Sequence, residues 1–196
     1  MRAEIDAIQA KSECFNMRVI GHHDLNGHGD GMQLLKQGRY VYLAHLGTSP
    51  MALSILDVGD PTEPQLITQI PHAPNTHSHK VQIVGDILIQ NQERPYFDKS
   101  VAASVPNEAG IKIYSIEKPT EPREIGNLKL PGKGVHRMWF TDGKYAHVGA
   151  MLPGIHERAY LIADISNPTN PKEVGRWWIP GTKEGEEPPA DWTPFD

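Results

Sequence analysis

The sequence predicts an all-β chain built from about three similar units of four short strands. Three observations support this prediction. Short apolar runs alternate with turn residues along most of the chain, the 17 prolines and 18 glycines fall between those runs, and one strand-turn-strand pattern occurs three times. Proline and glycine interrupt strands and form the turns between them. We therefore expect antiparallel sheet, with a short helix or irregular segment confined to the N-terminus.

The recurring pattern is an apolar strand that ends at a turn with two prolines. It occurs at residues 53–64, 111–122 and 160–171. The prolines fix φ and remove backbone donors, which stops the strand. Asp57 and Asp164 are placed to accept hydrogen bonds from amides of the bend. A further strand is expected after each turn, at residues 65–70, 123–128 and 172–177.

A hairpin is predicted before each of these turns, because two apolar runs flank a glycine turn. The glycine turns are at Gly38, Gly85 and Gly143. The paired runs are residues 32–35 with 40–44, 80–84 with 87–90, and 137–140 with 145–148. A hairpin and two further strands give four strands in each unit.

The spacing of the units indicates how they are arranged. Pro61, Pro119 and Pro168 lie roughly 50 to 60 residues apart, close to the about 40 to 50 residues of one four-stranded propeller blade. The extra length of the middle unit is attributed to an inserted loop at residues 93–109. A β-sandwich whose turns happen to be alike is the alternative. It would not explain why the strands, the proline turns and the glycines occupy matching positions in all three units. The predicted fold is therefore a partial β-propeller of about three blades.

The predicted organisation has three parts. Residues 1–18 form an N-terminal extension, in which residues 4–14 have room for two or three helical turns. Residues 19–180 form the blades. Residues 181–196 are an inter-blade connection or a truncated tail.

At the repeated turns the chain resembles a known family. Residues 163–171, Ala-Asp-Ile-Ser-Asn-Pro-Thr-Asn-Pro, are similar to the LVIVD repeat, in which a Leu-Val-Ile-Val-Asp strand precedes an Ile-Ser-Asp-Pro-x-x-Pro turn. The resemblance covers residues 19–180. Residues 75–81 and 132–138 look like a bacterial subgroup of unassigned activity. More distantly, the fold type is similar to that of selenium-binding proteins, which implies metal-dependent sulfur chemistry by analogy alone.

The resemblance also raises a question of size. Members of the family usually have about twice this length, and closed propellers have roughly four to eight blades. Three blades leave two exposed sheet edges, which invite pairing with other chains. Two explanations stay open. Either the chain is a fragment, which the polar, proline-rich residues 184–196 favour, or two copies associate through their open blade edges to close one ring.

Composition excludes several classes of function. The formal net charge is −5 and no basic run occurs, so a nucleic-acid partner is not expected. No stretch of about 18 apolar residues is present, and residues 1–14 lack the apolar core of a signal peptide. We therefore expect a cytoplasmic protein without a membrane partner. Cys14 is the single cysteine, which excludes an internal disulfide and a cysteine metal cage.

The ten histidines are the main candidates for chemistry. His79 and His136 each precede the first strand of a hairpin at equivalent positions, with Asp30 or the nearby His28 as their counterpart in the first unit. If that strand is the innermost strand of its blade, these side chains face a shared channel. His45, His72, His147 and His156 have no histidine counterpart in the other units and are expected to be structural or surface residues.

Two roles for the channel histidines stay open. Neutral imidazoles from separate strands are suitable ligands for a divalent transition metal, or they cap strand ends by bonding backbone carbonyls. For the metal hypothesis the candidate ligands are His22, His28, His79 and His136, the candidate catalytic acids or bases are Asp24 and Glu93, and His23 and His77 extend the cluster. The corresponding functions are a metal-dependent enzyme acting on a small organic molecule and a non-catalytic protein-interaction module.

Overall fold

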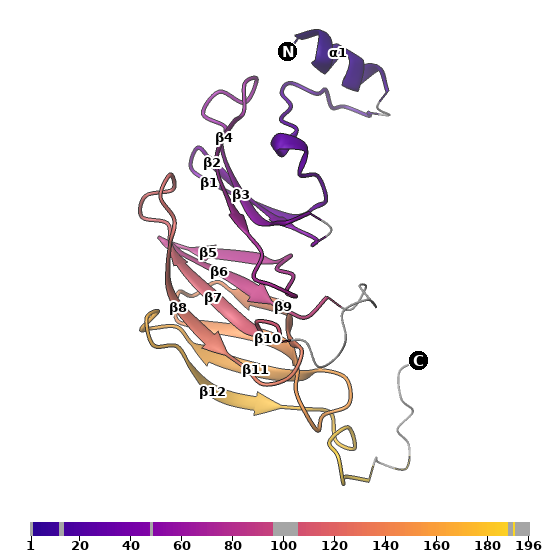
Figure 1. Ribbon diagram of the computed structural model, residues 1–196, viewed down its shortest axis with the longest axis vertical. Coiled ribbons are helices and arrows are strands. Elements are labelled where there is room, and N and C mark those ends of the chain that lie inside the picture. Colours follow the sequence, from indigo (N-terminus) through magenta and orange to yellow (C-terminus); the bar gives the residue numbers. More distant parts are fainter. Residues whose placement is uncertain (1, 12–13, 48, 96–105, 188–189, 191–196) are drawn as a thin grey trace.

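The computed structural model describes residues 2–11, 14–47, 49–95, 106–187 and 190. Within these residues, twelve strands form three four-stranded antiparallel sheets. The sheets follow one another as the blades of a partial propeller, with α1 beyond the first blade (Figure 1). The all-β prediction is confirmed. No helix in the described part of the chain has the length and apolar character needed to cross a membrane.

Each blade is built from consecutive strands, and every strand pairs with the next one in sequence. Blade one comprises β1 (Gly31–Gln37), β2 (Tyr40–His45), β3 (Met51–Asp57) and β4 (Gln65–Pro71). Blade two comprises β5 (Val81–Val84), β6 (Ile87–Gln92), β7 (Gly110–Ser115) and β8 (Arg123–Lys129). Blade three comprises β9 (Gly134–Phe140), β10 (Tyr145–Met151), β11 (Ala159–Asp164) and β12 (Lys172–Trp177).

The N-terminal segment carries the helical structure of the described residues. The helix α1 spans Arg2–Ala10, and a single 3₁₀ turn, η1, spans Leu25–Gly27. The predicted helix at residues 4–14 includes residues 12–13, which lie outside the described residues. So do residues 96–105 of the expected loop insertion, and residues 188–189 and 191–196 of the expected tail.

The proline turns end the strands as predicted. Asp57 Oδ1 accepts a hydrogen bond from the Gly59 amide at 2.8 Å. Asp164 Oδ1 does the same for the Ser166 amide at 2.8 Å. These side chains satisfy amides that the proline-containing bend removes from the strand ladder.

The hydrophobic core lies between neighbouring blades. Ile89, Ile113 and Leu161 are among the residues of the cluster between blades two and three, and each is at most 1% exposed. A second cluster, which includes Tyr42 and Leu88, joins blades one and two. Each blade is therefore stabilised mainly by the apolar face of its neighbour, as in other repeat proteins.

The proline turns also pack against the neighbouring part of the chain, and glycine makes this close approach possible. A Cβ atom on Gly126 of β8 would lie 1.9 Å from the Pro168 carbonyl oxygen of blade three. A Cβ atom on Gly21 would lie 2.1 Å from the Pro61 carbonyl oxygen of blade one. The segment around Gly21 thus packs on blade one as β8 packs on blade three.

This packing predicts that replacing two equivalent glycines, Gly126 and Gly175, by alanine has different effects on stability. Gly126→Ala should lower the free energy of unfolding by about 1–3 kcal/mol, because a methyl group would collide with backbone. Gly175 pairs with Ile162 as Gly126 pairs with Ile113, but the nearest atom to a Cβ there is the Ile162 side chain at 3.5 Å. Gly175→Ala should therefore be close to neutral. Urea denaturation of both variants checks this, and equal effects would contradict it.

Candidate metal centre

Four side chains meet where the inner strands of blades two and three approach each other. His77 and His79 precede β5, Glu93 follows β6, and His136 lies in β9. Isolated bridges pair Glu93 with His77 and with Gly134. Gly134 allows the approach, since a Cβ atom there would lie 2.1 Å from the Gln92 carbonyl oxygen. The backbone therefore holds a carboxylate of blade two against an imidazole of blade three.

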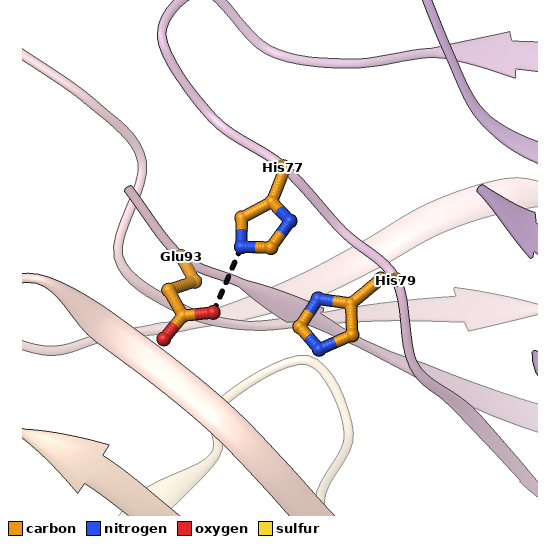
Figure 2. Close-up of side chains that lie close together, drawn as sticks. All are labelled: His77, His79 and Glu93. Atoms are coloured by element: carbon orange, nitrogen blue, oxygen red, sulfur yellow. Dashed lines mark hydrogen bonds and ion pairs between the residues drawn. The ribbon is translucent and has the colours of Figure 1, made fainter. Parts of the chain in front are cut away.

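The Glu93 carboxylate is the centre of this group and is fully buried. His77 Nε2 lies 2.8 Å from Glu93 Oε2, as Figure 2 shows. His136 Nδ1 lies 2.9 Å from the same oxygen and 3.2 Å from Oε1. Two imidazoles thus bind one buried carboxylate.

His79 is the fourth side chain of the cluster, and Figure 2 draws no hydrogen bond between it and the Glu93 carboxylate. Its ring stacks on that of His77, with centroids 4.5 Å apart and planes at 12°. The centroid of His136 is 5.1 Å away. The Asn91 amide nitrogen lies 3.3 Å from His79 Nδ1 and also donates to the Val135 carbonyl. Asn91 therefore holds His79 in place and links it to β9.

The electrostatic environment keeps His79 neutral. Burial, together with the neighbouring His77 and His136, lowers the pKa of His79 from 6.5 to about 3. A neutral imidazole has one lone pair, and on His79 this lone pair accepts the Asn91 hydrogen bond at Nδ1, so a metal ion bound there would displace that bond. One ligand atom from each of His77, His79 and Glu93 lies within 4.8 Å of the others. Two imidazoles and a carboxylate are a donor set that first-row divalent metals accept.

The structure brings together three of the six residues proposed from the sequence. His79, His136 and Glu93 lie in the cluster described above. The group with metal-ligand spacing among the described residues consists of His77, His79 and Glu93, so His136 contacts Glu93 without belonging to it. The other three predicted residues, His22, His28 and Asp24, also lie outside this group. His22 Nδ1 lies 3.2 Å from Glu4 Oε1, the exposed Asp24 caps η1, and the His28 backbone closes that turn on Leu25.

The register explains why the first blade contributes no histidine to this group. Counted back from the hairpin turns, Met32 occupies in β1 the position of His79 and His136. The expected counterpart was Asp30 or His28, which precede β1. A bulge at the start of β1 shifts the register there, and this irregularity is not visible as a motif in the sequence.

His77 belongs to the centre, although the sequence indicated it only as an extension of the cluster. The sequence feature that indicates its role is the spacing of His77 and His79, which are two residues apart. In an extended chain, residues two apart point to the same side. The segment before β5 therefore places both imidazoles over Glu93.

A second buried network in blade one has the Asp–His–Ser hydrogen-bond order of the catalytic triad in serine hydrolases. His45 Nδ1 lies 2.9 Å from Asp30 Oδ1, and His45 Nε2 lies 2.8 Å from Ser54 Oγ. Ser54 is fully buried, and its hydroxyl also accepts a hydrogen bond from Gln69 Nε2 at 3.0 Å. A nucleophile needs an open approach for the substrate. This network therefore connects the strands of blade one and leaves no room for an acyl group.

Comparison with known proteins identifies the repeats. Residues 28–70 and 142–178 match the model of the LVIVD repeat family. The first segment covers the strands of blade one, and the second covers β10 to β12. The expected resemblance is confirmed at the first and third proline turns, and the turn at residues 119–122 lies outside the matched ranges. These comparisons give no support to the distant similarity with selenium-binding proteins. No curated protein matches the chain.

The buried histidines predict a loss of stability in acid. The folded-state pKa of His79 is about 3 and that of the buried His72 about 4, both below the ordinary 6.5. The unfolded chain therefore binds protons first, and stability should fall as the pH drops from about 6.5 towards 3, by up to ~1.4 kcal/mol per pH unit for each group.

Replacing His79 should flatten this acid dependence. His79→Gln removes the group, so the free energy of unfolding should change less between pH 7 and pH 4 than in the unmodified protein. His156→Gln, at an exposed position, is the matched control. Urea denaturation across this range measures the effect, and parallel profiles for all three proteins would refute it.

Proposed function

Because the chain carries LVIVD repeats arranged as propeller blades, we propose that it binds a divalent transition metal between its inner strands and uses the metal in a reaction of a small organic molecule. The ligands are His77, His79 and Glu93, with His136 as a fourth donor. The observation that carries this proposal is the hydrogen bonding of His77.

Both ring nitrogens of His77 face acceptors. Nδ1 lies 2.9 Å from the Leu46 carbonyl oxygen, which accepts only, so Nδ1 carries a proton. Nε2 lies 2.8 Å from a carboxylate oxygen of Glu93. A neutral imidazole has one N–H, so a second proton must lie between Nε2 and the carboxylate. A metal ion would replace that proton.

The Leu46 contact also favours metal binding over simple strand capping. A metal-binding histidine commonly donates its other N–H to a backbone carbonyl, which fixes the ring and leaves one lone pair for the ion. His77 has this arrangement. Capping alone would not require a buried carboxylate between His77 and His136.

The centre has a defined chemical use. A bound divalent metal supplies a Lewis acid that polarises a carbonyl group or lowers the pKa of a water molecule. In this proposal Glu93 acts as a ligand, which differs from the acid or base role expected from the sequence. In the metal-free protein Asn91 acts as a positioning residue, because its amide donates to His79 Nδ1 and to the Val135 carbonyl.

Metal titration tests the proposal. Untagged protein freed of metal with EDTA should bind one Co(II) or Zn(II) per chain, measured by calorimetry and elemental analysis. Binding should release at least one proton, seen as a dependence of the enthalpy on the ionisation enthalpy of the buffer. Glu93→Gln and the pair His79→Ala, His136→Ala should each weaken binding by about 100-fold or more.

His156→Ala serves as the control, because this exposed histidine lies outside the cluster. Far-UV circular dichroism of each variant shows whether the fold is retained. Binding that is absent in the unmodified protein, or unchanged in the folded cluster variants, would overturn the proposal.

We further propose a second candidate function, association with another copy of the chain through the open face of blade three. Trp139, Tyr160 and Trp177 are 62%, 41% and 57% exposed. Tyr160 pairs with Trp177 across β11 and β12, while Met138 and Leu161 point to the opposite, buried face. Contiguous exposed aromatic residues are typical of interaction surfaces.

Sedimentation tests this association. The unmodified protein should show a mass that rises with concentration, and Trp177→Glu should abolish the increase by placing a charge on the apolar face. Lys172→Glu, on the same strand, should leave association unchanged. A monomer at every concentration would exclude this function while leaving the metal proposal standing.

A further inference from the structure

A second layer of equivalent residues lies next to the metal centre. Counted from the hairpin turns, Gln33 in β1, Arg137 in β9 and Lys80, which directly precedes β5, take equivalent places in the three blades. Lys80 and Arg137 directly follow His79 and His136 in sequence. All three residues of the layer line one cavity of about 450 Å³. The convergence of inner strands thus produces a second pocket from one row of the repeat.

The electrostatics of this cavity favour an anion. Lys80 is only 8% exposed, and none of the ion pairs among the described residues includes Lys80 or Arg137. Lys80 and Arg137 line the same cavity, so their positive charges lie on one shared wall. Two adjacent cations, one of them buried, are unfavourable in a chain without a compensating anion.

The remaining walls define the shape of the ligand. Gln33 Oε1 accepts the Val81 amide at 2.9 Å, which leaves its NH₂ group as a donor for the cavity. Gln82, Trp139 and Tyr160 also line the space. The indole of Trp139 offers a flat apolar surface beside the two cations. A volume of this size suits a small molecule.

We propose that this cavity binds a small organic anion, with its carboxylate or phosphate group between Lys80 and Arg137 and its apolar body against Trp139. The guanidinium fork of Arg137 matches the paired oxygens of either group. This site is formed by residues outside the metal cluster and does not depend on a bound metal. Because Trp139 and Tyr160 also belong to the exposed face of blade three, ligand binding competes with association of two copies through that face.

Calorimetry of EDTA-treated protein with aromatic probes tests the site. Benzoate or phenyl phosphate should bind, and the neutral benzamide should not. Tighter binding of benzoate identifies a carboxylate site, and tighter binding of phenyl phosphate identifies a phosphate site. Arg137→Gln should weaken binding by about tenfold or more, whereas Lys129→Gln, at an exposed position of β8, should not.

A second variant separates ligand binding from a structural role. Lys80→Met should abolish binding of the anion and raise the melting temperature of the free protein, because it removes a buried cation without an ion-pair partner among the described residues. Equal binding of benzamide and benzoate, unchanged affinity in Arg137→Gln, or a lower melting temperature of Lys80→Met would overturn the proposal. Since metal is absent throughout, these outcomes are independent of the metal centre.

Discussion

The packing of one blade on the next is the constraint on which the structure depends. A four-stranded blade has two faces, and its apolar side chains, such as Ile113 of β7 and Leu161 of β11, are buried only against a neighbour. The same packing brings β5, β6 and β9 together at the inner edge. The buried Glu93 carboxylate and its histidines therefore exist only where two blades meet.

The strands were predictable from the sequence because their signals are local. Alternating apolar residues, glycine hairpin turns and the repeated prolines each act over a few residues, and Asp57 and Asp164 cap the bends as their positions indicated. The site was predictable in part, because His79 and His136 share a place in the repeat. His22 lies in a segment with no repeat register, and His28 precedes the irregular start of β1, where the register shifts between Gly31 and Gln33.

Burial separates the two histidine networks that resemble sites. His45, Asp30 and Ser54 have the hydrogen-bond order of a catalytic triad, but the serine is enclosed and already bonded to Gln69. The His77–Glu93 contact differs because its hydrogen bonds leave a proton that another cation can replace. Residue types alone do not distinguish the two networks. They differ in which lone pairs and protons already take part in hydrogen bonds.

Glu93 forms backbone bridges to both His77 and Gly134, so its carboxylate lies on the seam between two blades. The spacing of the donor atoms is consequently tied to the curvature of the propeller. A wider angle between the blades would move His136 away from Glu93, and a narrower one would force the chains together at Gly134. The distances between Glu93 and its histidines therefore depend on the angle between neighbouring sheets, and so on the curvature of the row of blades.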